Sequence, residues 1–221
     1  MVFTVTDLAE FVKSSEKTIY EMRRDSLRYS FQEYLSLALS QAITALEEGN
    51  YGIGAVYIFR HKGRELIVVG RNQMISRKNT HLHAEEDVIS SFEGLLRGEK
   101  RYKSNVHLTR KAPHKKTEKI LVTTIEPCIG CLRRIITHKV DSLFIGQKDL
   151  LGGAVLDDKH KHLPEMWKNL WLAQDTRVII AKNFIPRKYL TLIEKAHLFN
   201  RDHLDKLISK KGLFNIDELK I

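Results

Sequence analysis

Two short motifs bring together the residue types that hold a catalytic zinc ion. His83 and Glu85 are separated by one residue, and Cys128 and Cys131 form a Cys-x-x-Cys motif directly after Pro127. A catalytic zinc has three protein ligands and one position left for water. Cysteines three residues apart project from one face of the first turn of a helix, where the helix dipole favours their thiolate forms. The sequence therefore predicts one zinc ion per chain, bound by the histidine and the two cysteines.

Glu85 is the residue expected to move protons. Zinc lowers the pKa of its bound water, and hydrolysis by that water also requires a carboxylate that takes the water's proton and returns it to the substrate. In the middle of a helix, a residue two positions from His83 would point to nearly the opposite side. The two side chains can therefore share a site only where a helix begins, and we predict a helix that begins at or just before His83.

Neither motif is specific when it occurs alone. A Cys-x-x-Cys pair is also found as half of a structural zinc site, as a redox pair or as two buried thiols. A structural site requires a fourth ligand, and His81, His107 and His114 are the nearest candidates. All three lie in polar segments, where a histidine is usually solvated. The two motifs together favour a catalytic site.

The composition is typical of a soluble, folded protein. Of the 221 residues, 43% are hydrophobic, and no segment approaches the roughly 18 consecutive apolar residues that a membrane span requires. The chain has two cysteines, both in the motif above, which leaves none for a disulfide framework. We expect a cytoplasmic protein, or a nuclear one if the source is eukaryotic, with no membrane partner.

Apolar periodicity predicts alternating helices and strands. Apolar residues three and four apart indicate helices over 31–46 and 83–96, and a short helix is expected after Thr6. A helix beginning near Pro127 separates the third and fourth strands and makes them parallel. An irregular segment follows Gly152, and helices are expected from Pro186 and over 201–211. The predicted strands are 54–59, 65–70, 120–124, 141–145 and 177–181.

This pattern predicts an α/β fold, a three-layer α-β-α sandwich with a central mixed five-stranded sheet. We expect a catalytic domain over 31–183, preceded by a helical extension over 1–30 and followed by C-terminal helices over 184–221. The catalytic domain contains a basic insertion over 97–119.

The segment from Glu99 to Glu118 is predicted to be a long surface loop, because it lacks periodicity and contains Pro113. Nine Lys and Arg residues and two Glu lie between Arg97 and Lys119, in a chain with a formal net charge of +10. An excess of positive charge favours polyanionic partners such as RNA. The alternative is a flexible loop whose charges are only solvated. The expected phosphate contacts are Lys100, Arg101, Lys103, Arg110, Lys111, Lys115 and Lys116.

The chain resembles the tRNA adenosine deaminase branch of the cytidine deaminase superfamily, whose zinc signature is His-x-Glu with Pro-Cys-x-x-Cys. The long insertion, the first thirty residues and the segment 211–221 have no evident counterpart in that branch. The similarity is carried by Gly54-Ala55-Val56, Gly70-Arg71-Asn72, His83-Ala84-Glu85, the segment from Thr124 to Cys128, the segment from Phe144 to Asp149, and the strand and helix over 177–203.

The resemblance implies a cytidine deaminase-like fold and a homodimer. It also implies that Asn72 binds the substrate base or its sugar, that Asp149 lies on a loop touching the nucleotide, and that Ala84 contributes to substrate binding. From the residues alone, Asn72 is equally compatible with a turn position and Asp149 with a solvated capping carboxylate.

Three functions follow from these observations. The resemblance implies hydrolytic deamination of a base in tRNA or another structured RNA, from adenosine to inosine, with the base turned out into the zinc pocket. A deaminase of a free base, nucleoside or nucleotide, of the cytosine, guanine or dCMP type, would carry the same zinc motif. The third function is a non-catalytic RNA-binding accessory subunit. Glu85 argues against it, because a subunit that only binds RNA needs no proton carrier.

Overall fold

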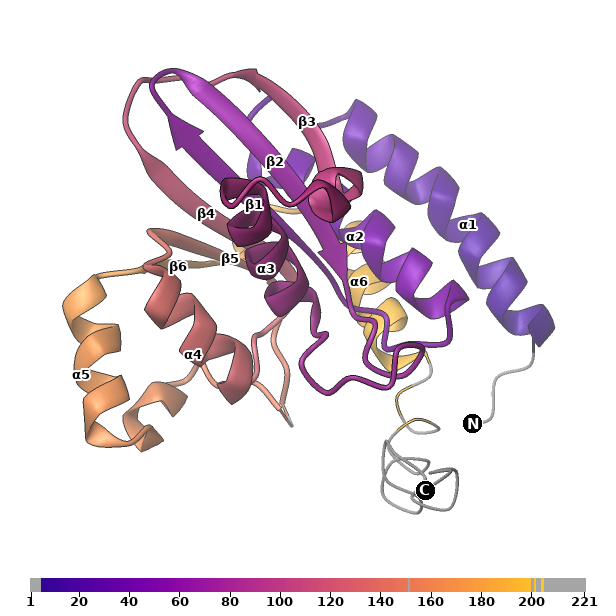
Figure 1. Cartoon of the computed structure of the whole chain (residues 1–221). Helices are drawn as coiled ribbons and strands as arrows, with labels where there is room; N and C mark the ends of the chain where they lie inside the picture. Colours follow the sequence, from indigo (N-terminus) through magenta and orange to yellow (C-terminus); the bar gives the residue numbers. More distant parts are fainter. Residues whose placement is uncertain (1–4, 151, 200, 202–203, 205–221) are drawn as a thin grey trace, which may run out of the picture.

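A mixed six-stranded sheet forms the centre of the protein (Figure 1). The computed structural model describes residues 5–150, 152–199, 201 and 204. The strands lie in the order β3-β2-β1-β4-β5-β6; β1 is antiparallel to β2 and β4, β2 is antiparallel to β3, and β4, β5 and β6 are parallel. They are β1 (Gly54–His61), β2 (Arg64–Arg71), β3 (Val106–Lys111), β4 (Glu118–Ile125), β5 (Ser142–Gln147) and β6 (Arg177–Ile180).

Helices cover both faces of the sheet (Figure 1). One core lies between the sheet and α2 (Phe31–Glu47) with α6 (Arg187–Leu198), and α1 (Val5–Arg24) packs against both helices. The other core lies under α3 (Ala84–Leu96), α4 (Ile129–His138) and α5 (Glu165–Gln174). Successive strand residues enter opposite cores. The predicted three-layer sandwich is confirmed, and so is the parallel pairing of β4 with β5.

The five-stranded sheet and the long surface loop were wrong predictions. The stretch after α3 instead forms a 3₁₀ helix, η1 (Lys100–Asn105), and then strand β3, which pairs with β2 and extends the sheet. Burial alternates along β3, with Val106, Leu108 and Arg110 on its more buried side. The third inward position is an arginine, so the alternation of apolar and polar residues is too short to be recognised.

Two helices also differ from expectation. The first helix has 20 residues and is not short, and its buried side includes Ser15, Ile19 and Met22. Helix α5 lies in the segment that was expected to be irregular. Most of the helix expected over 201–211 lies outside the described residues.

Among the described helices, none is both long and apolar enough to cross a membrane. The remaining short elements are the 3₁₀ helices η2 (Lys159–His162) and η3 (Ala181–Asn183).

A buried ion-pair network joins α2 to the sheet at the end of β1 where it turns into β2. Glu65 is fully buried and accepts hydrogen bonds from Arg60 Nε (2.7 Å), Arg110 Nε (2.7 Å) and the Tyr34 hydroxyl (2.9 Å). Arg110 also holds both carboxylate oxygens of Glu33, at 2.6 and 2.9 Å. We call these five residues the Glu65 network. The network holds β3 against the rest of the domain, because each charged side chain that points inward forms an ion pair with a side chain of opposite charge.

Candidate active site and metal centre

The starts of α3 and α4 position the three expected metal ligands. His83 and Cys128 are the residues immediately before α3 and α4, and both have an extended backbone, with φ, ψ of −72°, 157° and −72°, 173°. Helix α3 begins at Ala84, one residue later than the predicted start at or just before His83, so His83 lies immediately outside the helix. The extended conformation at His83 is what allows His83 and Glu85 to reach the same site, which a regular helix would prevent.

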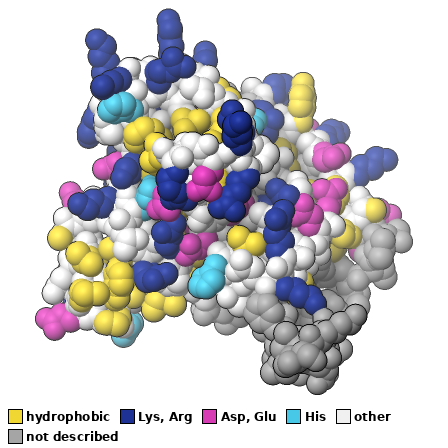
Figure 2. Space-filling view, in the orientation of Figure 1, with side chains coloured by type: hydrophobic (Ala, Val, Ile, Leu, Met, Phe, Trp, Pro, Cys, Tyr) yellow, Lys and Arg dark blue, Asp and Glu magenta, His cyan; other side chains and the backbone are white. Residues whose placement is uncertain are grey.

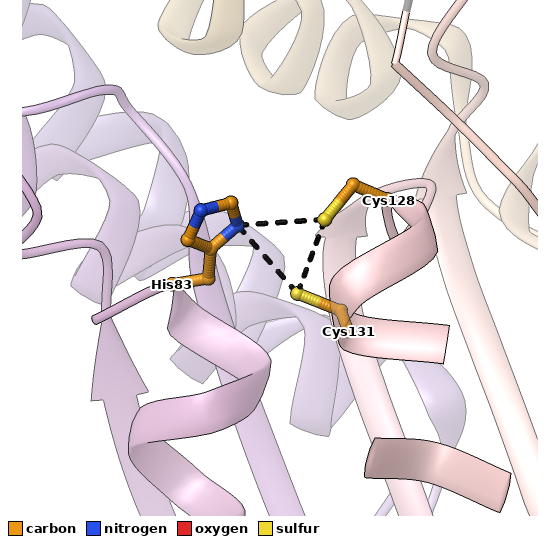
Figure 3. Close-up of side chains that lie close together, drawn as sticks. All are labelled: His83, Cys128 and Cys131. Carbon is orange, nitrogen blue, oxygen red and sulfur yellow. Dashed lines mark hydrogen bonds between the residues drawn. The ribbon is translucent and has the colours of Figure 1, made fainter. Parts of the chain in front are cut away.

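The three ligand atoms form a nearly equilateral triangle. His83 Nδ1 lies 3.6 Å from Cys128 Sγ and 3.6 Å from Cys131 Sγ, and the two sulfur atoms are 3.6 Å apart. Figure 3 shows the imidazole ring facing both sulfurs. Tetrahedral zinc, with bonds of about 2.3 Å to sulfur and 2.0 to 2.1 Å to nitrogen, places such atoms roughly 3.5 to 3.8 Å apart. The donor set and its spacing therefore fit one zinc ion.

The metal group has the composition of a catalytic site. Within the described part of the chain, the group consists of His83, Cys128 and Cys131, and none of His81, His107 and His114 belongs to it. Three protein ligands leave one tetrahedral position for water or substrate. The hydrogen bond between the two cysteine side chains is the main cause that lowers the pKa of Cys128 to about 4, so this sulfur is a thiolate at neutral pH and ready to bind a metal.

Glu85 lies beside the metal ligands and is buried. Its Oε1 accepts a hydrogen bond of 2.9 Å from Thr123 Oγ1, and its Oε2 lies 3.3 Å from Cys131 Sγ. Burial raises the pKa of Glu85 above its ordinary value, because the charged carboxylate loses hydration. The Thr123 hydroxyl is also 3.0 Å from the Ile125 carbonyl, so its proton has an acceptor when the carboxyl group is protonated. This arrangement suits a group that accepts a proton and returns it.

A cavity of about 210 Å³ opens above the metal ligands. Asn72 and Asp149, the two residues expected to contact the nucleotide, both lie at its wall. Ala84 is fully buried, packs in the core under α3 and does not line the cavity. The lining residues are Tyr51, Ile53, Asn72, Met74, His83, Glu85, Ile125, Glu126, Cys128, Asp149, His197 and Arg201.

No motif in the sequence indicated a cation at this cavity. Arg201 Nη1 lies 3.2 Å from Asp149 Oδ1 and also contacts His197 Nε2. His197 and Arg201 are four residues apart, the spacing of neighbours on a helix, and this is the signal that could have paired them. The result is a positively charged side chain at the cavity wall, beside Asp149.

Glu126 was also missed, although it precedes Pro127 in the cysteine motif. Its carboxylate accepts hydrogen bonds from the backbone N–H groups of Asp149 (3.2 Å), Val155 (3.0 Å) and Leu156 (2.7 Å). A β-bridge between Cys128 and Gly153 adds a second link. The loop that follows β5 is therefore attached to the segment that carries the metal ligands.

The basic insertion is split by the strand within it. Lys100, Arg101 and Lys103 lie in η1 at one end of β3, whereas Lys111, Lys115 and Lys116 lie at the other end. Arg110 belongs to the Glu65 network, and its side chain is 8% exposed. None of the seven lines the cavity. The phosphate contacts expected from the insertion thus do not form one continuous surface, and Arg110 is engaged by two carboxylates.

Comparison with known proteins defines the class of the protein. Residues 29–147 match the family described as the cytidine and deoxycytidylate deaminase zinc-binding region. The chain belongs to this family. Together with the geometry above, this makes it a zinc-dependent hydrolytic deaminase, whose ion fits the group formed by His83, Cys128 and Cys131.

Individual relatives are more distant. The chain is 29% identical over 137 residues to tRNA-specific adenosine deaminase 2 of Danio rerio, covering 60% of this chain but only 58% of that protein. It is 31% identical over 119 residues to the tRNA-specific adenosine deaminase of Buchnera aphidicola, covering 53% and 67%. A solved structure of guanine deaminase from Nitrosomonas europaea has a similar fold, with a TM-score of 0.51, 17% identity and coverage of 81% and 92%.

Proposed function

We propose that the protein converts adenosine to inosine in tRNA. The observation that carries this proposal is the similarity to proteins named tRNA-specific adenosine deaminases, at 29% and 31% identity. The formal net charge of +10 supports a polyanionic substrate, because such an excess attracts nucleic acid over long distances. In this proposal one adenine base is turned out of the RNA and enters the cavity of about 210 Å³.

Each polar group of the site has a role in this reaction. His83, Cys128 and Cys131 would hold the zinc ion, which would supply Lewis-acid activation of a water molecule. Thr123 holds Oε1 of Glu85, which leaves Oε2, on the side of Cys131, for proton transfer. Glu85 takes one proton from the attacking water and delivers it to the ring nitrogen. It then takes the second proton from the new hydroxyl group on the base carbon and gives it to the amine, which leaves as ammonia.

The substrate contacts form the second part of the proposal. The Met74 N–H donates to Asn72 Oδ1 at 3.1 Å, which fixes the side chain while Nδ2 donates to the base or its sugar. Asp149, at the cavity wall, accepts a hydrogen bond from a sugar hydroxyl. Both are short polar side chains on the rigid loops that follow β2 and β5, which holds the base in a fixed orientation.

The test is a substrate panel with the zinc-loaded protein. Total tRNA, free bases, nucleosides and nucleotides are incubated separately, and ammonia and base composition are measured by mass spectrometry. We expect inosine in tRNA, and none in a parallel reaction with Glu85→Ala. Conversion of free guanine or dCMP without inosine in tRNA would replace the proposal by a nucleotide-metabolising enzyme. Zinc-loaded protein that binds tRNA but releases no ammonia from any substrate would indicate an accessory subunit.

A further inference from the structure

Two turns lie side by side at the end of the sheet opposite the metal centre. One joins β1 to β2 over 61–64, and the other joins β3 to β4 over 111–117. The Ala112 N–H donates to the Gly63 carbonyl at 2.8 Å, and His61 Nδ1 lies 2.8 Å from Thr117 Oγ1. The Tyr29 hydroxyl adds a hydrogen bond of 2.7 Å to the Lys111 carbonyl. These bonds and the Glu65 network beneath hold the two turns in a fixed relation.

The two turns concentrate positive charge that the protein does not neutralise. Neither segment contains Asp or Glu, and within the described residues no carboxylate forms an ion pair with any of their Lys and Arg side chains. In Figure 2, Lys and Arg side chains project at the top of the molecule, over this end of the strands. We call these exposed cations the turn patch: Lys62, Arg64, Lys111, Lys115 and Lys116.

The arrangement of the turn patch opposes the stability of the sheet. Arg64 and Lys111 are direct partners in the β2–β3 ladder. Like charges directly opposite one another destabilise an antiparallel pair. The neighbouring pair in the same ladder, Glu65 with Arg110, has opposite charges and faces the core. The repulsive pair is on the outer side, where an external anion can relieve it.

The turn patch contrasts with the cations at the other end of β3. Arg101, in η1, pairs with Glu99 at 2.7 Å, so that end is partly neutralised. At about 3.3 Å per residue, the six residues of β3 separate the two groups by roughly 20 Å. The basic residues that follow β3 therefore form one surface with Lys62 and Arg64 of the β1–β2 turn, and not with the basic residues of η1.

We propose that the turn patch binds phosphate groups of a structured RNA while the target base occupies the catalytic cavity. This inference rests on the proposed function. Strand β1 runs from Gly54, next to the cavity residue Ile53, to His61 at the patch, and its eight residues span roughly 25 Å. A single nucleotide in the cavity does not reach the patch, whereas a folded RNA of the size of tRNA does. The patch therefore serves only a polynucleotide substrate.

The experiment compares two variants of the full chain with equal changes in charge. In the patch variant, Lys62, Arg64, Lys111, Lys115 and Lys116 are all replaced by Gln. The control replaces five exposed cations on α1, η3 and α6, namely Lys13, Lys17, Lys182, Arg187 and Lys195, by Gln. Thermal unfolding verifies that both variants fold. The dissociation constant for total tRNA is then measured over a series of salt concentrations.

We expect the patch variant to bind tRNA at least tenfold more weakly at low salt and to lose about 0.7 to 0.9 of log–log salt slope per phosphate contact removed. We expect the control to change little. Ammonia release from a trinucleotide carrying the target base stays at the parental rate in both variants, because a trinucleotide does not reach the patch.

The outcomes separate this inference from the function on which it rests. If the parent binds no RNA and converts a free base, the proposed function fails. If the parent binds and deaminates tRNA but the patch variant matches the control, the function stands and the patch inference is overturned. Vesicles of equal parts phosphatidylcholine and phosphatidylserine are a third arm. Loss of vesicle binding with unchanged tRNA binding would assign the patch to a lipid surface.

Discussion

Each end of the β1–β2 hairpin lies beside a carboxylate from a neighbouring helix, buried Glu85 at one end and half-buried Glu33 at the other, with different results. At the metal end, Glu85 has hydrogen-bonding partners in Thr123 and Cys131, and burial raises its pKa. At the turn end, burial of Glu33 is outweighed by hydrogen bonds from Arg110 and from the Tyr29 N–H, and the pKa of Glu33 is lowered. The donors around a carboxylate thus decide whether its pKa is raised, as a proton carrier requires, or lowered, as in a fixed charge.

Removal of a metal ligand is expected to have the largest effect, and this effect is confined to the metal end. In Cys131→Ala, the two remaining side chains no longer hold zinc, and deaminase activity is lost with it. Metal analysis of the purified variant gives the zinc content per chain. The Glu65 network does not contact the metal ligands, so its ion pairs at the turn end of the hairpin remain in the variant. Full zinc occupancy in Cys131→Ala would exclude the proposed ligand set.

Removing the proton carrier is expected to have the next largest effect. Glu85→Ala keeps one zinc per chain and folds, but turnover falls by about a hundredfold or more, because the general base and acid is lost and the ligands remain. The measurement is kcat together with zinc content. Turnover near the parental value would show that another group moves the proton.

At the opposite end, Arg110→Met is expected to cost stability without affecting chemistry. It removes the cation shared by buried Glu65 and half-buried Glu33, and the free energy of unfolding falls by about 3 to 5 kcal/mol. The matched control is Arg101→Met. The Arg101 side chain is 72% exposed, and its ion pair with Glu99 is screened by solvent, so little change in the free energy of unfolding is expected. Urea unfolding measures both. A loss of kcat per folded molecule in Arg110→Met would contradict the separation of the two ends.

A comparison of the parent with Arg110→Met over a range of pH gives a second test, in which the sign of the effect is defined. The pKa of Glu33 is lowered in the folded state, so its contribution to stability is present above the unfolded pKa and is lost as pH falls through the folded pKa. The stability difference between the parent and Arg110→Met therefore shrinks below about pH 4.3, the ordinary pKa of glutamate. A difference that stays constant down to about pH 3, well below that ordinary pKa, would show that the ion pair with Glu33 is not its source.

The smallest effect is expected from the residue that orients Glu85. Thr123→Val preserves the shape of the buried side chain but removes the hydrogen bond to Oε1, and kcat falls about tenfold, equivalent to about 1.4 kcal/mol. Thr123→Ser retains the hydroxyl and restores most of the rate. Equal losses in the two variants would mean that packing, and not the hydrogen bond, is responsible.

The metal site could be predicted from sequence because its geometry is local. His83 and Glu85 lie at one helix start and the cysteines at another, so short motifs encode the orientation of each pair. The end of β3 could not be predicted in the same way. Arg110 faces the core because it forms ion pairs with Glu33 and Glu65 there, and these partners lie 77 and 45 residues away in the chain. A polar residue whose partners are remote is indistinguishable from a solvated one in a sequence.

Helix α1 illustrates a related difficulty. Its buried stripe runs through Phe11, Ser15, Ile19 and Met22 at helical spacing, but the serine interrupts the apolar pattern. The Ser15 hydroxyl donates to the Phe11 carbonyl at 2.6 Å, which allows a polar side chain to be buried there. Local hydrogen bonding of this kind satisfies the side chain without leaving a signal in hydropathy.

The attachment of the β5–α5 loop to Cys128 limits how this enzyme can change its substrate. A Cβ atom on Gly153 would lie 2.3 Å from the Glu126 carboxyl carbon, so no larger residue fits without moving the segment before the metal ligands. Leu150, on the same loop, is 77% exposed and meets no such restriction. The loop can therefore be varied at position 150 without moving the segment that carries the metal ligands. Insertions or deletions around position 153 would alter metal binding together with specificity, so loop length is a poor route for engineering this fold.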